Sequence, residues 1–142
     1  MKIRELMTDQ VVTVSQNEAV TTAARLLKRH NVGALPVCDD SGKLRGIVTD
    51  RDIVLRCIAA GEDPRETRVS EIMSRGVVTA TAEDSVDRAA QLMSEDQIRR
   101  LPIMENGRVV GMVALGDMAR SSTCGMEASQ ALSDISSNIR RK

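Results

Sequence analysis

The stretch Gly46-Ile47-Val48-Thr49-Asp50-Arg51-Asp52 decides the fold, because it reads as a strand that turns directly into a helix. Its β-branched residues favour a strand. Two polar side chains, Thr49 and Asp52, are three positions apart at the turn. A weaker copy occurs at Gly111-Met112-Val113-Ala114-Leu115-Gly116-Asp117. The rest of the chain can be understood as support for these two turns.

The two turns belong to an internal repeat. Glu5-Leu6-Met7-Thr8 corresponds to Glu71-Ile72-Met73-Ser74 at a separation of 66 positions, and Gly46 corresponds to Gly111 at 65. A nearly constant separation over about fifty residues indicates a duplication, and two copies are too few for a solenoid. We therefore expect two repeats that face each other about a pseudo-two-fold axis.

Each copy predicts a β-α-β-β-α unit. The expected elements of the first copy are a helical turn at 3–7, a strand at 11–14, a helix with Val20, Ala23, Ala24 and Leu27 on one face, strands at 35–38 and 44–49 around a hairpin turn, and a helix at 50–60. The strand–helix–strand part implies a right-handed parallel crossover. The fold class is α/β (α+β), with two facing three-stranded sheets. The predicted divisions are repeat 1 at 1–61, a linker at 62–68, repeat 2 at 69–120 and a C-terminal helical tail at 121–142.

Local signals add further expectations. Ser15-x-x-Glu18 predicts a capping box at the start of the first long helix, with Thr81-x-x-Asp84 as a looser counterpart. Pro36 lacks an N–H and is expected at a sheet edge or a strand start. The tail is expected to form a helix that packs on its own domain or on a dimer mate. Its apolar face would carry Ala128, Ala131, Leu132, Ile135 and Ile139.

Composition excludes several classes of protein. Twenty basic and twenty acidic residues cancel, which argues against a protein that binds nucleic acid mainly through phosphate neutralisation. No apolar run is long enough to span a membrane, and the N-terminus lacks the apolar run of a signal peptide. Three widely spaced cysteines suggest reduced thiols and a cytoplasmic protein. They are expected to be apolar fillers, with a redox role for Cys124 as a minor alternative.

Nothing in the sequence predicts an enzyme. The only histidine, His30, is expected to be a solvated cation near a helix C-terminus. Without His and Cys clusters, metal ligation is not indicated. The chain has no Phe, Tyr or Trp, so its core must be aliphatic, and a planar ligand would be held between aliphatic side chains.

Binding is better supported than catalysis. The Thr49 hydroxyl and the free N–H groups expected at the helix start suit a phosphate. The Asp52 carboxylate can accept hydrogen bonds from two adjacent hydroxyls, as in a ribose. In the alternative interpretation, Thr49 or Asp50 simply caps the helix and Asp52 stabilises its dipole. Repetition of the Gly and Asp weakens this alternative, although a duplicated cap would also repeat.

The sequence resembles the CBS-domain family, as a tandem CBS pair (Bateman module) of the small stand-alone bacterial type. The resemblance covers both copies, from about residue 3 to residue 119. The matching motifs are Glu5-Leu6-Met7-Thr8, Val11-Val12-Thr13-Val14, Gly33-Ala34-Leu35-Pro36-Val37 and the Gly46 to Asp52 turn, each with its copy-two partner.

The resemblance implies a regulatory sensor that binds adenosine-containing ligands, such as AMP, ADP, ATP or S-adenosylmethionine, in clefts between the repeats. It implies that Asp of the repeated turn holds ribose and that Thr or Ser holds phosphate. The first implied site comprises Thr49, Asp52, Thr79, Ile98, Arg99 and Arg100. The second comprises Asp117, Thr13, Val14, Val32, Gly33 and Ala34. No catalytic cofactor is expected, and the adenosine nucleotide is the expected ligand.

The two implied sites are unequal. Ala114 stands where copy two should have Thr or Ser, and Gly33-Ala34 stands where copy two has Arg99-Arg100. Site one is therefore expected to take a phosphorylated adenosine. Site two would be empty, weak or suited to an uncharged adenosyl group. The alternative for Arg99 and Arg100 is a pair of solvated charges.

The expected partners are a second copy of the chain, as a homodimer, and an unidentified effector protein. No nucleic acid or membrane partner is expected. The rival interpretation is a scaffold that dimerises without binding a small molecule.

Overall fold

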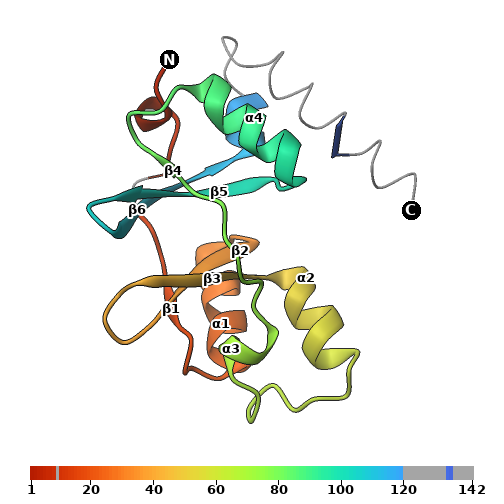
Figure 1. Ribbon diagram of the computed structural model, residues 1–142. Helices are drawn as coiled ribbons and strands as arrows, with labels where there is room; N and C mark the ends of the chain where they lie inside the picture. The colour runs from red at the N-terminus through yellow and green to blue at the C-terminus, as the bar shows by residue number, and fades with distance from the viewer. Residues whose placement is uncertain (9, 120–133, 136–142) are drawn as a thin grey trace. The chain divides into compact units, whose positions relative to one another are not determined.

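The computed structural model describes residues 1–8, 10–119, 134 and 135 of the 142-residue chain. The predicted order of elements is confirmed, although the first strand covers Val14–Ser15 and not 11–14 (Figure 1). The first half contains η1 (Ile3–Glu5), β1 (Val14–Ser15), α1 (Val20–His30), β2 (Ala34–Cys38), β3 (Leu44–Thr49), α2 (Asp50–Asp52) and η2 (Ile53–Ile58). The second half contains α3 (Val69–Ile72), β4 (Ala80–Thr81), α4 (Val86–Asp96), β5 (Arg100–Glu105), β6 (Arg108–Ala114) and α5 (Leu115–Ala119).

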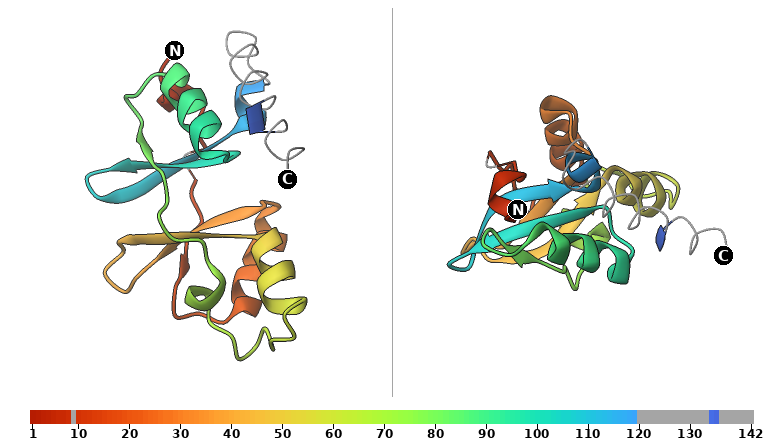
Figure 2. Two further views of the ribbon diagram at one scale, coloured as in Figure 1. Left: turned by 45° about the vertical axis from the view of Figure 1, so that its right-hand side comes forward. Right: turned by 90° about the horizontal axis from the view of Figure 1, so that it is seen from above.

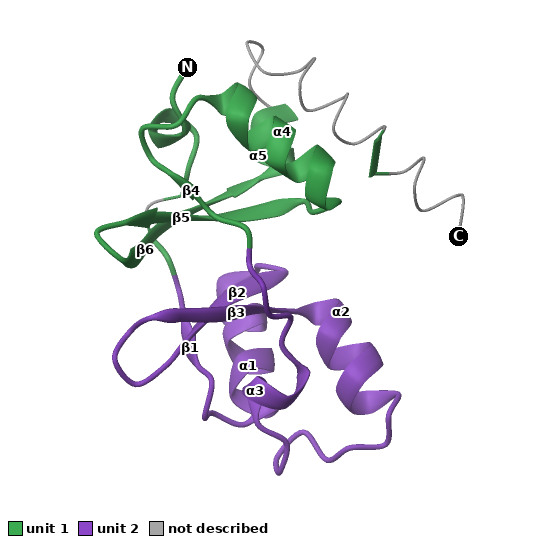
Figure 3. Ribbon diagram, in the orientation of Figure 1, with its two compact units in different colours: residues 1–11, 78–142 green, residues 12–77 purple. Residues whose placement is uncertain are grey.

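The chain folds into two compact units that differ from the sequence repeats (Figure 3). Unit 1 contains 1–11 and 78–142, and unit 2 contains 12–77. The segment that opens each repeat thus belongs to the unit built from the other repeat: η1 packs in unit 1, and α3 packs in unit 2.

Each unit is a three-stranded sheet with its helices on one face (Figure 2). In unit 2 the order is β1-β2-β3, with β1 parallel and β3 antiparallel to β2, and β4-β5-β6 repeats this pattern in unit 1. The unit 2 core includes the α1 residues Val20, Ala23 and Leu27, which confirms the predicted apolar face. The predicted mixed α/β class with two three-stranded sheets is therefore confirmed.

A short bridge closes the free edge of each sheet. In unit 2 the Ile47 N–H donates to the Ser74 carbonyl at 3.0 Å, and the Ser74 N–H donates back at 2.9 Å. In unit 1 Thr8 and Met112 exchange the same pair of bonds at 2.9 and 3.1 Å. These bridges explain why the motif around Met7 and its copy around Met73 are repeated: each satisfies backbone groups that an edge strand would leave unpaired.

The predicted capping box at Ser15 is wrong, because α1 begins at Val20 and its N-cap is Ala19. The first two N–H groups of α1 donate instead to the carbonyls of Thr67 and Pro64, at 2.9 and 3.1 Å. Backbone carbonyls distant in sequence therefore accept the hydrogen bonds of the α1 N-terminus, in place of the predicted local side chain.

Pro36 also lies elsewhere than predicted, in β2, the middle strand of its sheet. Its partner across the antiparallel pair is Ile47, whose N–H donates away from β2 to Ser74. On the other side, β1 reaches only as far as Val37 and Cys38. The proline therefore stands where neither neighbouring strand requires its missing N–H.

The helix predicted at 50–60 forms in two parts. Three α-helical residues, Asp50–Asp52, are followed by a π-helix over Ile53–Ile58. Gly61, the expected stop, has φ +77°, a left-handed value that glycine adopts at low cost. His30 is the exposed last residue of α1, which agrees with its expected place.

The β2–β3 hairpin is organised by Asp39. Its carboxylate accepts from the Ser41 hydroxyl at 2.8 Å, the Lys43 N–H at 3.0 Å and the Arg45 guanidinium at 2.8 Å. These hydrogen bonds, led by that from Ser41, hold the pKa of the Asp39 carboxyl far below its ordinary value. The turn is therefore stabilised by the ionised form of this side chain.

We expect acid to destabilise the wild-type protein more than the Asp39→Asn variant. A folded-state pKa below the unfolded value means that ionised Asp39 stabilises the fold above about pH 4 and that this contribution is lost as pH falls from there. Urea midpoints measured at pH 5 and pH 3 should fall further for the wild type. Parallel falls in both proteins would contradict this role.

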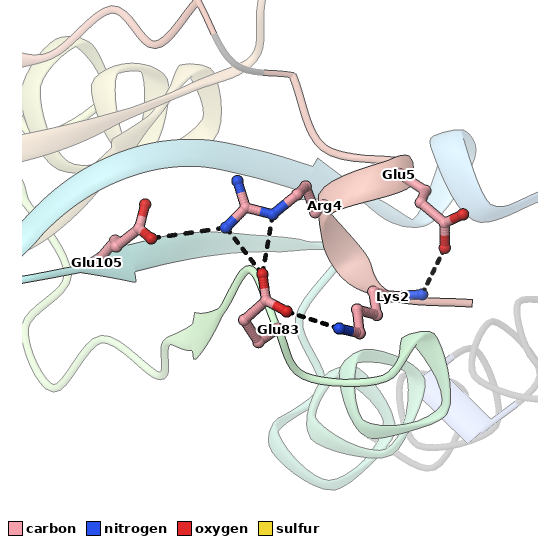
Figure 4. Close-up of polar contacts among 5 residues, drawn as sticks. All are labelled: Lys2, Arg4, Glu5, Glu83 and Glu105. Carbon is pink, nitrogen blue, oxygen red and sulfur yellow. Dashed lines mark hydrogen bonds and ion pairs between the residues drawn. The ribbon is translucent and has the colours of Figure 1, made fainter.

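The N-terminal segment is anchored in unit 1 by burial and by surface charge. Lys2 and Arg4 lie 2.8 and 2.9 Å from the Glu83 carboxylate, and Arg4 lies 3.5 Å from Glu105 (Figure 4). These side chains are about half exposed, so the network is weak and screened by salt. Burial of Ile3, which is 1% exposed, is the stronger anchor.

Part of the predicted tail packing falls within the described residues. Ile135 is 2% exposed and belongs to the core of unit 1, and the Ser94 hydroxyl donates to Asp134 at 2.5 Å. For Ile135, packing on its own domain is therefore confirmed. Cys124 and the other residues of the predicted apolar face lie outside the described residues, namely Ala128, Ala131, Leu132 and Ile139.

We expect Ile135→Ala to lower the free energy of unfolding by about 2 kcal/mol, because it removes buried methyl groups and leaves a cavity. Val32→Ala is the control, since Val32 is 44% exposed, and it should change stability by less than about 0.5 kcal/mol. Denaturant titration of both variants tests the comparison. Equal losses would contradict burial of Ile135 in the core of unit 1.

Candidate functional site

The turn from β3 into α2 is a closed hydrogen-bonded ring in unit 2. The Asp52 N–H donates to Thr49 Oγ1 at 3.0 Å, and the Thr49 N–H donates to Asp52 Oδ2 at 3.0 Å. Thr49 is thus the N-cap of α2, and the pair forms a capping box. The capping interpretation is therefore correct for Thr49 Oγ1 and Asp52 Oδ2. A ligand must therefore bind through the hydrogen-bonding capacity of Thr49 and Asp52 that this ring leaves unused.

The expectation of free N–H groups at this helix start is wrong. The Asp50 N–H donates to the Gly33 carbonyl at 3.0 Å, and the Arg51 N–H donates to the Asp50 carboxylate at 2.8 Å. With the Asp52 N–H held by Thr49, every N–H of α2 is paired. A phosphate would therefore have to be bound by side chains, with the Thr49 hydroxyl proton as one available donor.

The Asp52 carboxylate retains acceptor capacity. The residue is 9% exposed, and Oδ2 is held by Thr49. Oδ1 lies 3.8 Å from Arg56 Nε, which is an ion pair but too long for a hydrogen bond. Among the described residues, no buried side-chain nitrogen or oxygen lacks a hydrogen-bond partner. Oδ1 accepts no such bond, so solvent, and hence a ligand hydroxyl, can reach it.

The corresponding turn in unit 1 keeps half of the ring. The Ala114 N–H donates to Asp117 Oδ2 at 3.0 Å, as the Thr49 N–H does to Asp52. Ala114 has no hydroxyl to offer in return. The sequence difference at Ala114 therefore removes one hydroxyl from this turn and leaves its carboxylate in place.

Within unit 2, the structure brings Thr49 together with residues that were assigned to the other implied site. Ala34 pairs with Thr49 across β2 and β3, and the Gly33 carbonyl accepts from Asp50. Val14 is buried in β1, and Thr13 and Val32 are exposed at positions flanking the strands.

In unit 1, Arg99 and Arg100 adjoin the Asp117 turn. Arg100 pairs with Ala114, and the Arg99 carbonyl accepts from the Leu115 N–H at 2.8 Å. Both arginine side chains are exposed, and neither makes a hydrogen bond or ion pair to any described residue. Ile98 and Thr79, the other implied contacts, are half-buried. The assignment of these residues to one ligand or another stays a sequence prediction.

Sequence reasoning missed Arg56. Its Nη1 donates to the carbonyls of Ile72 and Met73 at 3.2 and 3.4 Å, while Nε faces Asp52. The signal was present, because Arg56 stands four positions after Asp52, the spacing at which side chains meet on a helix.

Comparison with known proteins identifies the family. The sequence matches the CBS domain at residues 3–58 and again at 69–123. The chain belongs to the CBS-domain family. It is 48% identical over 134 residues to the CBS domain-containing protein YhcV of Bacillus subtilis, covering 94% of each chain. It is 38% identical over 117 residues to hypoxic response protein 1 of Mycobacterium tuberculosis, covering 82% of each.

Solved structures agree with the tandem CBS pair. A crystal structure of hypoxic response protein 1 with two coordinated zinc ions superposes with a TM-score of 0.78 at 37% identity, covering 84% of this CBS pair and 98% of that chain. The CBS domain pair of protein MJ0100, in complex with 5′-methylthioadenosine and S-adenosyl-L-methionine, superposes with a TM-score of 0.76 at 33% identity, covering 84% and 98%.

Two negative findings apply to the part of this CBS pair that the structure describes. No three or more His, Cys, Asp or Glu side chains gather there in a way that could hold a metal ion. Nor does any helix there have the length and apolarity needed to cross a membrane.

Proposed function

We propose that this CBS pair is a regulatory module that binds an adenosine-containing ligand, namely AMP, ADP, ATP or S-adenosylmethionine. The observation that carries the proposal is the Asp52 carboxylate, which keeps one oxygen open beside the Thr49 hydroxyl. The adenosyl ligands of the related MJ0100 pair support it. Asp52 would accept from the ribose hydroxyls, and Thr49 would donate to a phosphate.

The remaining contacts are proposed from the sequence. Exposed Arg99 and Arg100 would neutralise phosphate charge, which suits a nucleotide better than an uncharged adenosyl group. Asp117 would hold ribose in a weaker second site, since Ala114 supplies no hydroxyl. The signal would be a population shift, in which the ligand favours one arrangement of the chain that an effector protein recognises.

The absence of Trp, Tyr and Phe makes the test direct. The purified protein should absorb little near 260 nm, so a peak that persists through gel filtration is a co-purified nucleotide. Mass spectrometry of the released material names it. A thermal-shift panel of the four candidates follows, in which a ligand at 100 times its Kd should stabilise the fold by about 2.7 kcal/mol. A transparent protein with flat melting temperatures would contradict the proposal.

We also propose that the chain forms a homodimer. Val54, Leu55 and Ile58 on η2 are 55%, 49% and 55% exposed, an apolar surface that water does not favour. A related CBS-CP12 protein is hexameric. Light scattering should give twice the chain mass for the wild type and a lower mass for Leu55→Glu. A dimer with no nucleotide response would favour the scaffold interpretation, and a wild-type monomer would contradict self-association.

A further inference from the structure

Arg56 links the candidate carboxylate to a second segment of unit 2. Its Nε lies 3.8 Å from Asp52 Oδ1, and its Nη1 donates to the carbonyls of Ile72 and Met73 at 3.2 and 3.4 Å. Those carbonyls are at the C-terminal end of α3 (Val69–Ile72), where a helix leaves carbonyls unpaired and favours a cation. One guanidinium group thus contacts both the α2 turn and the end of α3.

The two oxygens of the Asp52 carboxylate have different surroundings. Oδ2 is held by the Thr49 N–H at 3.0 Å. Oδ1 is faced by positive charge from Arg56 at a distance that leaves its lone pairs free for hydrogen bonds. The Asp52 side chain is 11% exposed and that of Arg56 is 54% exposed. A carboxylate that is nearly buried benefits from a neighbouring cation, although solvent around Arg56 reduces the effect.

We propose that Arg56 is the positioning residue for Asp52, holding the carboxylate so that Oδ1 faces a pair of vicinal hydroxyls on a bound nucleoside. The inference rests on the proposed function. Hydrogen bonds to the Ile72 and Met73 carbonyls fix the position of the Arg56 guanidinium at the end of α3. The guanidinium therefore favours one position of the Asp52 carboxylate. The carboxylate is therefore ordered before the ligand arrives, which lowers the entropic cost of binding.

The corresponding turn in unit 1 lacks this residue. The position four after Asp117 is Ser121, which carries no charge. Asp117 accepts a hydrogen bond from the main-chain N–H three residues before it, and Asp52 accepts the equivalent hydrogen bond. The two turns thus share this main-chain hydrogen bond and differ in the residue four positions after the aspartate.

A competing interpretation gives Arg56 a purely structural role, as a clip between η2 and α3. Both roles predict some loss of stability when the side chain is removed. They differ in ligand selectivity, because a clip has no reason to distinguish a ribose from a sugar that lacks both hydroxyls. Selectivity for the diol is therefore the measurement that separates them.

The test compares Arg56→Met with Arg51→Met. Both replace arginine by an unbranched apolar side chain in the same helical run, and Arg51 is exposed with no side-chain bond to any described residue. Calorimetric titration with AMP and with 2′,3′-dideoxyadenosine monophosphate gives the diol selectivity of each protein. Arg56→Met should weaken AMP about fivefold and leave the dideoxy affinity within about twofold. Arg51→Met should change neither.

The possible results separate the two proposals. Equal weakening of both ligands by Arg56→Met would overturn the positioning role, because it would indicate a structural clip or a direct phosphate contact. Unchanged AMP affinity in Arg56→Met would also overturn it. Both results leave the proposed function standing. Failure of the wild type to bind AMP, ADP, ATP and S-adenosylmethionine would overturn the proposed function and this inference together.

Discussion

Replacing Gly46 by alanine is expected to lower the free energy of unfolding by about 3 kcal/mol, more than most single substitutions. A β-carbon at this position would lie 2.6 Å from the Ser74 carbonyl oxygen and 2.8 Å from the Met73 sulfur. Methionine can move aside, but a backbone carbonyl cannot move without breaking its own contacts. That carbonyl accepts the Ile47 N–H, so relief of the clash would also break the bridge that closes the sheet edge.

A matched control is available in the other unit. Gly116 lies in α5, has no atoms within 4 Å of its ideal β-carbon, and has an ordinary negative-φ backbone. Gly116→Ala should therefore be neutral or stabilising by about 0.5–1 kcal/mol, since alanine is the better helix former. Urea titration of both variants checks the prediction. A Gly46→Ala protein as stable as Gly116→Ala would mean that the Ser74 bridge is not a fixed part of the fold.

Gly111 repeats the arrangement of Gly46. Its β-carbon would lie 2.8 Å from both the Thr8 carbonyl oxygen and the Met7 sulfur. The glycine at the start of each turn motif is therefore explained by close approach of a backbone segment, not by the ligand. The residues of the repeated motif therefore have different roles. The glycine allows a backbone segment to approach the sheet edge, while the aspartate accepts a main-chain hydrogen bond in the turn.

Local patterns predicted the elements of this protein well, and failed where a distant segment intervenes. The alternation and β-branching of 44–49 predicted β3 with its observed bounds. The start of α1 was wrong because its first N–H groups are satisfied by Thr67 and Pro64, which the sequence near Ser15 cannot reveal. Pro36 was misplaced for the same reason, since its tolerance depends on where β1 ends and on the outward N–H of Ile47.

The sequence indicated the turn from β3 into α2 but not its hydrogen bonding. The spacing of Thr49 and Asp52 marked the turn, yet the same spacing produces the capping box that occupies half of their hydrogen-bonding capacity. The Gly33 carbonyl that uses the Asp50 N–H comes from the loop before β2, and only the folded sheet brings it there. Arg56 could have been found from its i+4 spacing to Asp52, whereas its bonds to α3 could not.

The largest expected effect on binding is that of Asp52→Ala, which should weaken AMP about 100-fold. Two charge-assisted hydrogen bonds to ribose hydroxyls contribute about 3 kcal/mol together, which corresponds to that factor. Asp117→Ala should leave the stronger AMP affinity within about threefold, because its turn lacks the hydroxyl that Thr49 supplies.

The two variants control for each other structurally. Each removes a carboxylate that accepts one main-chain N–H at 3.0 Å, from Thr49 in one turn and from Ala114 in the other. The shared loss should cost each variant about 1 kcal/mol of stability, so a difference in ligand affinity cannot come from the cap alone. Calorimetric titration with AMP, together with melting curves of the unliganded proteins, separates the two quantities. Equal losses of affinity, or none, would mean that the asymmetry at Ala114 does not determine where the nucleotide binds.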